Sequence, residues 1–331
     1  MKCPSILNWK GMNMIRAFVL LTTVVFSLSA EITFAQSNTE LNDFNTALAN
    51  KRWQHGSADC SLNKDPALDV FKADDSSFIL RQNKCLNFEA PFIYVLVGQN
   101  KILVLDTGAL GDENGFSLYK EIKEIVGEQR FLDREVLVVH SHSHGDHHKG
   151  DSQFIGQPKV TVIKPKARAV KRFWKDKRWP KDEKHIDLGG REITLIPTPG
   201  HQEEALTVYD SHTQWLLTGD SFYPGLIYVK DWDDYRDSIA KLAVFTQENN
   251  VSAILGTHIE MKRNPQAYYP IGSTYQPNER ALPLTVDELQ SLNLKLQYQK
   301  KPQQLVYDSF VVKPLSALQK GISKIGKLFG G

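Results

Sequence analysis

The sequence predicts a mixed α/β protein in which strands and helices build one large domain. The chain has 331 residues, of which 41% are hydrophobic and 24% charged, the composition of an ordinary globular protein. Short β-rich runs alternate with segments of helical spacing, and no internal repeat or low-complexity linker separates them. This order is typical of α+β or layered α/β proteins.

The first 35 residues have the order of a secretory signal. Arg16 precedes the apolar run 17–30, and Thr33 and Ala35 then occupy the −3 and −1 positions of a cleavage site. The run has 14 residues, fewer than the roughly 20 that span a bilayer as a helix. We therefore expect a periplasmic or secreted protein, with an uncleaved membrane anchor as the alternative.

Charge and cysteine content say little about partners. The formal net charge is +2, and the excess lies in the signal segment, so the remainder is near neutral. With no recognised module either, nucleic acid is not an expected partner. Cys60 and Cys85 remain after cleavage. In an exported protein such a pair suggests a disulfide, and the alternative is two buried free thiols.

Between the signal and the tail, each element is predicted from its residue pattern. Residues 36–55 are polar and compatible with a helix, and strands occupy 68–106, where 92–98 and 101–108 form a hairpin. The following segments are predicted in order: helix 115–128, strand 135–142, strand 159–165, basic helix 166–184 broken at Pro180, strands 192–201, 205–210 and 215–220, helix 235–250, and strand 251–258.

The last segment, 313–331, is a basic amphipathic tail. It places one helical stripe of apolar side chains against lysines elsewhere: Leu315, Leu318, Ile322, Ile325 and Leu328 against Lys320, Lys324 and Lys327. Such a helix docks on the body of its protein or contacts an anionic membrane or a partner. We therefore divide the chain into a signal (1–35), a catalytic domain (36–312) and this tail.

The stretch VVHSHSHGDHHKG, residues 138–150, carries the strongest chemical signal. Five of the ten histidines lie between positions 140 and 148, at the end of an apolar run. Imidazole and carboxylate are common ligands of zinc and similar ions. His142 and His144 point to one side of an extended segment. Asp146 and His147 follow Gly145 on a turn or helix start, so the stretch can serve two ions.

Further ligand candidates follow at the ends of three predicted strands. IPTPGH ends in His201, WLLTGD in Asp220 and AILGTH in His258. Catalytic residues collect on such loops because the sheet holds the strand ends rigidly.

Taken together, H-x-H-x-D-H, T-P-G-H, T-G-D and a strand-end histidine resemble the metallo-β-lactamase-fold superfamily. VLDTG, which contains Asp106, matches its aspartate turn, and the resemblance spans about residues 68–260. It implies a single-domain, four-layer αβ/βα sandwich with a metal site at one edge of two sheets. The implied ligands are His142, His144 and His201 for the first metal, Asp146, His147 and His258 for the second, and Asp220 as a bridge. Asp106 would orient ligands, whereas His140 and His148 fall outside the motif.

The resemblance also implies a reaction class. The lactamases proper usually carry Cys or Ser at the position of Asp220, whereas the glyoxalase II, lactonase, phosphodiesterase and arylsulfatase branches carry Asp. We expect an exported hydrolase with two divalent metal ions, zinc first and iron or manganese as alternatives. Asp146 would orient the nucleophile. The substrate would be a small ester, thioester, lactone or phospho or sulfo ester, with lactamase activity as a weak side reaction.

Two other functions use the same residues. A mono-iron oxygenase of the persulfide dioxygenase type carries a similar motif. A binding protein with a vestigial site would have gaps in the ligand set, and the sequence has none. Covalent catalysis is disfavoured, because no G-x-S-x-G motif is present.

Two regions bear on the substrate. Residues 164–184 hold ten Lys/Arg against three Asp/Glu. They form either a lid that attracts an anionic small molecule or a solvated helix whose aromatic side chains pack inward. Phe222, Tyr223 and Tyr228 are candidate pocket walls or core residues. The segments HGSADC, RQNKC, EAPF and PIGSTYQP resemble those of exported relatives of unassigned function and imply no substrate.

Overall fold

The computed structural model describes residues 43–112, 115–175 and 178–320. The chain divides into Met1–Thr46 and a compact unit, Ala47–Gly331, to which all elements below belong. The predicted signal, residues 1–35, lies outside the described residues. In the described ranges, no helix combines the length and hydropathy that crossing a bilayer requires.

The first sheet has six strands in chain order. They are β1 (Leu68–Asp74), β2 (Ser77–Gln82), β3 (Phe92–Val97), β4 (Lys101–Leu105), β5 (Glu135–Val139) and β6 (Val160–Val162). Pairing is antiparallel from β1 to β4, and β4, β5 and β6 are parallel. Every residue of β3 is buried, so both faces of the sheet are covered.

A second and a third sheet complete the strand framework. The second has the order β12 (Ala253–Gly256), β10 (Trp215–Gly219), β9 (Leu206–Asp210), β8 (Glu192–Pro197) and β7 (Lys184–Asp187). The third has the order β11 (Leu226–Val229), β14 (Val311–Pro314) and β13 (Leu305–Val306).

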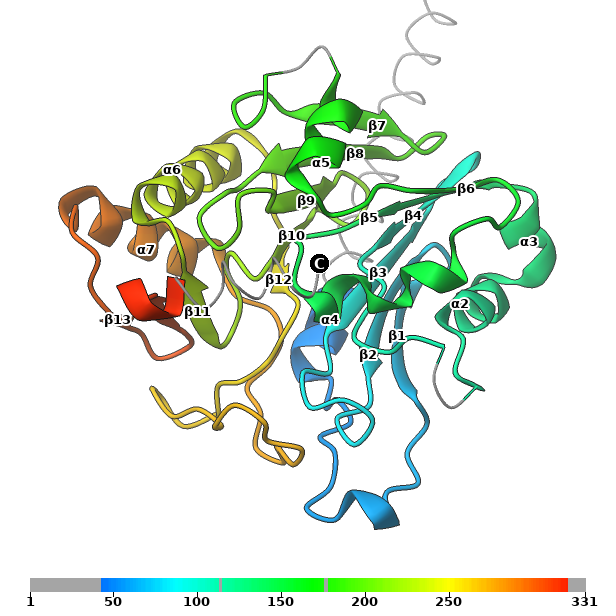
Figure 1. Ribbon diagram of the computed structural model, residues 1–331, viewed down its shortest axis with the longest axis horizontal. Helices are drawn as coiled ribbons and strands as arrows, with labels where there is room; N and C mark the ends of the chain where they lie inside the picture. Colours follow the sequence, from blue (N-terminus) through cyan, green and yellow to red (C-terminus); the bar gives the residue numbers. More distant parts are fainter. Residues whose placement is uncertain (1–42, 113–114, 176–177, 321–331) are drawn as a thin grey trace, which may run out of the picture. The chain divides into compact units, whose positions relative to one another are not determined.

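Helices cover the outer faces of the two larger sheets (Figure 1). Ile122 of α2 (Leu118–Val126) and Phe131 of α3 (Glu128–Leu132) share a core with Ile102 and Val104 of β4. Leu103 and Leu105 point to the other face of that strand and are equally buried. On the other side, α6 (Trp232–Glu248) and α7 (Val286–Tyr298) share a core with β8, β9, β10 and β12. The result is the expected four-layer αβ/βα sandwich.

A buried ion pair connects the two larger sheets. Arg191 forms two hydrogen bonds with Asp210, of 2.8 and 2.6 Å, on the second sheet. The same guanidinium donates to the Ser76 carbonyl at 2.7 Å and to the Ser77 hydroxyl at 2.9 Å, at the start of β2. Because every donor finds an acceptor from one sheet or the other, this arginine holds the layers in register.

A disulfide joins Cys60 and Cys85, with Cα atoms 5.1 Å apart. It is the first of the two alternatives left open for these cysteines. Cys60 begins the short helix η1 (Cys60–Leu62), and Cys85 lies in the β2–β3 loop.

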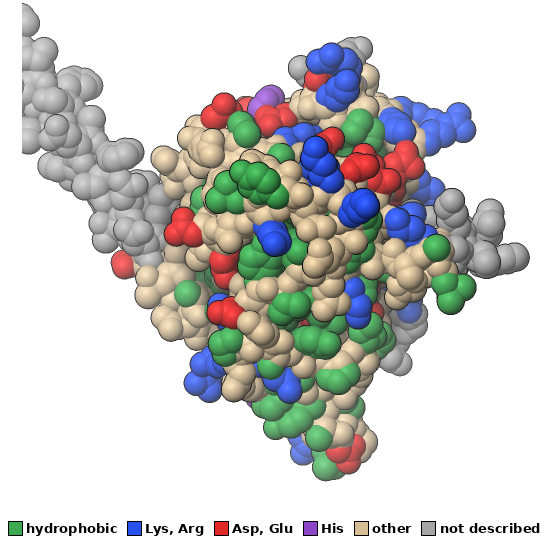
Figure 2. Space-filling view, turned by 90° about the vertical axis from the view of Figure 1, so that its left-hand side faces the viewer, with side chains coloured by type: hydrophobic (Ala, Val, Ile, Leu, Met, Phe, Trp, Pro, Cys, Tyr) green, Lys and Arg blue, Asp and Glu red, His purple; other side chains and the backbone are tan. Residues whose placement is uncertain are grey.

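The structure corrects several predicted elements. The basic helix is much shorter than 166–184: α5 (Ala167–Trp174) ends where Lys175 adopts a positive φ of 51°, and a strand begins at Lys184. Trp174 is buried and donates through Nε1 to the Asp182 carbonyl, which closes the turn. The elements α3, α7, β11, β13 and β14 were also not predicted from the sequence. Charged side chains of both signs are interspersed on the face in Figure 2, with no single-sign patch.

Candidate metal centre

The candidate ligands converge because parallel strands end at a common edge. β4 and β5 are parallel, so Asp106 and the segment from His140 onward leave the first sheet side by side. β10 and β12 are also parallel, which places Asp220 beside His258 at the edge of the second sheet. A hydrogen bond from the Leu206 amide to the Ser141 carbonyl, 2.8 Å, connects the two edges. All seven predicted ligands therefore come together.

Three imidazoles form the first group. Nε2 of His142 lies 2.9 Å from Nδ1 of His144, and Nε2 of His201 lies 3.2 Å from each of these nitrogens. Tetrahedral zinc, with Zn–N bonds of about 2.0–2.1 Å, separates its nitrogen ligands by roughly 3.3 Å. The three nitrogens face one point at this spacing. Their arrangement fits three ligands of one cation better than three imidazoles hydrogen-bonded to one another.

The second group joins Asp146, His147 and His258. Oδ2 of Asp146 lies 3.1 Å from Nε2 of His147 and 3.2 Å from Nε2 of His258. Asp146 and His147 are carried by the single-turn helix α4 (Gly145–His148), as the sequence predicts. Nε2 of His147 is buried and has no hydrogen-bond partner of good geometry among the described residues, so this atom is available as a ligand.

Asp220 lies between the groups and offers one oxygen to each. Its Oδ2 lies 3.6 Å from Nε2 of His201 and 3.7 Å from Nε2 of His142. Its Oδ1 lies 3.6 Å from Nε2 of His258 and 3.8 Å from Nε2 of His147. Gly219 makes this approach feasible, because a Cβ there would lie 2.6 Å from Cβ of Ser141.

Hydrogen bonds behind the imidazoles fix which nitrogen is free. Nδ1 of His201 donates to the Tyr228 carbonyl at 2.6 Å, and Nδ1 of His258 donates to the Glu89 carbonyl at 3.0 Å. A carbonyl only accepts, so the proton sits on Nδ1 and the lone pair of Nε2 faces the site. Nδ1 of His147 lies 2.9 Å from Oδ2 of Asp106 and is oriented in the same way.

Asp106 is fully buried and holds the turn that carries the histidines. It has a positive φ of 68°, which is uncommon for a non-glycine residue. Oδ1 accepts from the Ser141 amide at 2.7 Å, and Oδ2 accepts from the Ser141 hydroxyl at 2.8 Å. These bonds tie the end of β4 to the end of β5, and with the contact to His147 they place Asp106 where the resemblance implies an orienting residue.

The pKa values of the histidines differ between the two groups, because of burial and of the nearby carboxylates. Burial lowers the pKa of His142 well below its usual value and that of His144 to about 3, so both are neutral. Burial also opposes the charged form of His258, but Asp220 and Asp146 outweigh it and raise its pKa to about 9. The second group thus attracts positive charge strongly, and a divalent cation can supply it in place of protons.

Other predicted residues lie elsewhere. His140 pairs with Asp151 at 2.8 Å and the Ile163 carbonyl at 2.9 Å, away from the ligands, and its ring packs against His148. The prediction that Phe222 lines the pocket is wrong, because this side chain is fully buried against Phe310 in the core of the second sheet.

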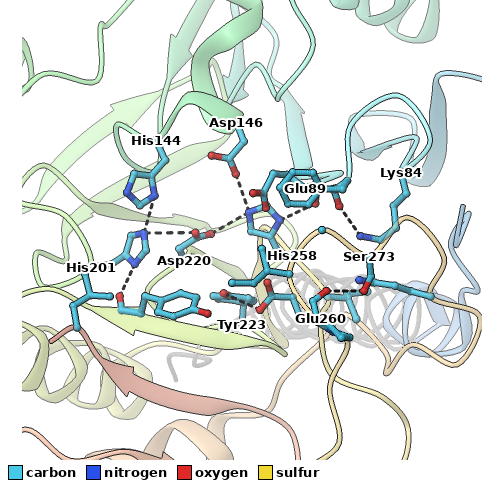
Figure 3. A pocket seen from close by; sticks show the side chains of 18 of the residues that line it. Lys84, Glu89, His144, Asp146, His201, Asp220, Tyr223, His258, Glu260 and Ser273 are labelled. Carbon is cyan, nitrogen blue, oxygen red and sulfur yellow. Dashed lines mark hydrogen bonds and ion pairs between the residues drawn. The ribbon is translucent and has the colours of Figure 1, made fainter. Parts of the chain in front are cut away.

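Five of the seven candidate ligands line a pocket of about 380 Å³ (Figure 3): His144, Asp146, His201, Asp220 and His258. Tyr223 and Tyr228 form part of its wall, as predicted, together with Phe88, Ile259 and Ile271. None of the described residues of 164–184 lines it, so the interpretation of this segment as a lid finds no support there. Lys84, Glu89 and Gln276 add polar groups from RQNKC, EAPF and PIGSTYQP, three segments that implied no substrate, and Glu260 adds another that was not predicted.

Comparison with known families now identifies the chain. The model of the metallo-beta-lactamase superfamily matches residues 86–258, from the β2–β3 loop to the last candidate ligand. The chain belongs to the metallo-beta-lactamase superfamily. The expectations of this fold and of a hydrolase of this superfamily are thereby confirmed.

The chain shares low sequence identity with the following superfamily members. It is 23% identical over 205 residues to the acyl-coenzyme A thioesterases MBLAC2 of Bos taurus and Homo sapiens, covering 50% of this chain and 72% of each relative. Similar solved structures include a metallo-beta-lactamase from Pontibacter korlensis (16% identity, TM-score 0.45, covering 70% of this chain and 100% of that one). Another is TMB-1 (14%, 0.48, covering 72% and 100%).

Proposed function

We propose that the protein is an exported hydrolase that uses two divalent metal ions, zinc first, to cleave a small carboxylic ester or thioester. One observation carries the proposal: the carboxylate of Asp220 presents Oδ2 to His142 and His201 and Oδ1 to His147 and His258. A bridging carboxylate between two complete ligand groups suits a pair of ions and is not needed by a single iron. The arrangement therefore favours hydrolysis over the mono-iron oxygenase alternative.

Each ligand group would hold one ion. His142, His144 and His201 would bind the first, Asp146, His147 and His258 the second, and Asp220 both. When bound, such a pair supplies Lewis acidity that activates water and polarises a carbonyl oxygen.

The remaining chemistry belongs to the chain itself. Asp146 is the partly exposed carboxylate of the second group and lines the pocket, so it can orient the attacking water by accepting its hydrogen bond. Tyr223 and Tyr228 form an apolar wall that excludes bulk water from one side. Cys60 and Cys85 are bonded to each other, so neither is a thiol nucleophile.

Two observations support esters and thioesters as the substrate class. The wall of Phe88, Tyr228 and Ile271 suits the hydrocarbon part of an acyl group. The similarity to acyl-coenzyme A thioesterases, although low, points to the same bond type. Lactones share the reacting carbonyl, while phospho and sulfo esters remain a less favoured part of the same proposal.

Export is supported by the disulfide. Such bonds persist in oxidising compartments and are rare in the cytosol. Together with the signal-like residues 1–35, the disulfide favours a periplasmic or secreted protein.

The test combines metal analysis with a substrate panel. The protein is purified without added metal or affinity tag, and its metals are quantified by inductively coupled plasma mass spectrometry. We expect about two zinc ions per chain and turnover of thioesters and esters that chelator abolishes and zinc restores. About one iron per chain, with oxygen uptake on persulfides and no ester turnover, would refute the proposal.

A further inference from the structure

Lys84 is a buried cation at the end of the pocket opposite His144 and His201 (Figure 3). Its side chain belongs to a residue that is only 3% exposed, and its Nζ donates one hydrogen bond, of 3.0 Å, to the Phe88 carbonyl. Among the described residues no carboxylate lies within ion-pair distance of this ammonium. An ammonium has three donors, so two of them are left for something else.

The usual explanation for a buried cation, a structural ion pair, applies to its neighbour and not to Lys84. Arg81 forms two hydrogen bonds of 2.6 Å with the carboxylate of Glu279. Since this pair already satisfies Glu279, Lys84 gains only a longer-range interaction from it. Burial of an unpaired ammonium is unfavourable for folding, which points to a role in binding.

A second buried polar side chain lines the same pocket. Gln276 is 3% exposed, and its side-chain amide makes no hydrogen bond to any described residue, so its NH2 group can donate to a ligand. Gly56 lies between the two segments that carry these side chains: its backbone packs between Cβ of Lys84 and the carbonyl of Thr274, which precedes Gln276 by two residues. A Cβ on Gly56 would lie 1.9 Å from that oxygen and 2.9 Å from Cβ of Lys84. The contact therefore requires glycine.

The segments without an assigned role meet here. HGSADC (55–60) pairs with PIGSTYQP (270–277) through a bridge between Gly56 and Tyr275 and through the backbone N–H of Gln276, which donates to the His55 carbonyl at 2.8 Å. The disulfide ties HGSADC to RQNKC (81–85), which supplies Lys84. EAPF (89–92) begins with Glu89, whose carbonyl orients His258. RQNKC, EAPF and PIGSTYQP thus line one end of the pocket, and HGSADC joins two of them through its bridge and its disulfide.

We propose that Lys84 and Gln276 form a recognition site for a carboxylate at the far end of the substrate's acyl group. The inference rests on the proposed function and narrows it to monoesters or monothioesters of short dicarboxylic acids. The reacting carbonyl lies at the metal groups, the methylene chain lies along Phe88 and Ile271, and the terminal carboxylate accepts hydrogen bonds from the Lys84 ammonium and the Gln276 amide.

The surroundings favour a single negative charge over a phosphate. Glu89 and Glu260 also line the pocket, and they repel a dianion more strongly than a monoanion. Lys84 supplies one positive charge and the amide of Gln276 supplies none, a set that matches one carboxylate.

The test compares ligands that differ only in the terminal group. Glutarate, adipate and pimelate are titrated into the metal-loaded protein by calorimetry, each beside its monoamide, which has the same shape without the second charge. The 4-nitrophenyl monoesters of the same acids and amides are assayed in parallel. Three proteins are used: wild type, Lys84→Met and the control Lys313→Met. Lys313 lies over the Tyr228 ring but does not line the pocket, so its replacement removes the same charge nearby.

We expect the wild type to prefer one dicarboxylate over its monoamide by about 10- to 100-fold, the range of a charge-assisted hydrogen bond. Lys84→Met should remove this preference, keep monoamide binding within about 2-fold, and unfold at the same or a higher temperature. Lys313→Met should keep the preference. Gln276→Met should reduce it in part.

Two results would overturn the inference. An unchanged preference in Lys84→Met would show that this ammonium does not contact the ligand. Equal loss of both ligands together with a lower melting temperature would show that Lys84 only holds the Phe88 loop. If no ester is hydrolysed, the proposed function fails, while the calorimetric comparison still decides the role of Lys84.

Discussion

Nδ1 of His258 donates a 3.0 Å hydrogen bond to the carbonyl of Glu89, a residue of the β2–β3 loop. The loop is anchored through Cys85 to Cys60. The orientation of a candidate ligand on the second sheet therefore depends on a disulfide-bonded loop of the first sheet.

This relationship predicts that the double variant Cys60→Ser/Cys85→Ser binds metal more weakly in the second group. The hydrogen-bond partners of a metal ligand typically contribute a factor of about 10 to 100 to metal affinity. A β2–β3 loop that the disulfide no longer anchors should lose part of this contribution. Dialysis against graded chelator, followed by metal analysis, should show one ion leaving earlier than in the wild type. Simultaneous loss of both ions, in step with unfolding by circular dichroism, would argue against the local effect.

Asp220→Asn is expected to lower metal content and ester turnover together. The amide replaces one of the two anionic oxygens with a nitrogen donor, so one group loses its shared ligand. Asp151→Asn is the matched control, because Asp151 pairs with His140 and touches no candidate ligand. Full metal content with unchanged turnover in Asp220→Asn would exclude the bridging role.

The preference for a dicarboxylate should decline as pH rises through about 8. Burial and the Arg81 charge lower the pKa of Lys84 to about 8, partly offset by Glu279, Glu260 and Glu89. Below this pH the ammonium is charged and binds the carboxylate; above it the amine is neutral and the preference is lost. The ratio of the KM values for the ω-amide and ω-carboxylate esters, measured from below to above this pH, tests whether the preference declines as pH rises. A ratio that stays constant to pH of about 9.5 would contradict it.

Arg191→Met should destabilise the fold by about 3–5 kcal/mol, because it leaves the Asp210 carboxylate buried without its partner. Urea denaturation measures the change. Arg178→Met is the control: that side chain is 76% exposed and pairs with Asp182 at the surface, where such pairs contribute little to stability. Equal effects would contradict the role assigned to the buried pair.

The side chains of the site could be predicted from sequence, because each ligand is a chemically distinctive residue at the end of an apolar run. The groups that orient them could not. Tyr228 and Glu89 act through backbone carbonyls, and a carbonyl is present in every residue. The role of Lys84 could not be predicted either, because RQNKC implies no substrate and only the packing around Gly56 distinguishes this lysine from the surface lysines of the chain.

Fold prediction succeeded and failed for similar reasons. Strands such as β4 and β5 are continuous apolar runs because both of their faces are covered, and they are easily recognised. β13 has only two residues and β14 four, too short for a period to be detected. The helix predicted over 166–184 failed because its charge pattern continues past Lys175, where the backbone turns.

The candidate ligands are divided between the edges of two sheets, and none of the groups is complete within one local segment. A nascent or unfolded chain therefore carries the histidines but no assembled site. If the protein crosses a membrane unfolded, it arrives without its ions and acquires them as it folds. The metal supply of the destination compartment, rather than that of the cytosol, would then decide which ion the enzyme contains.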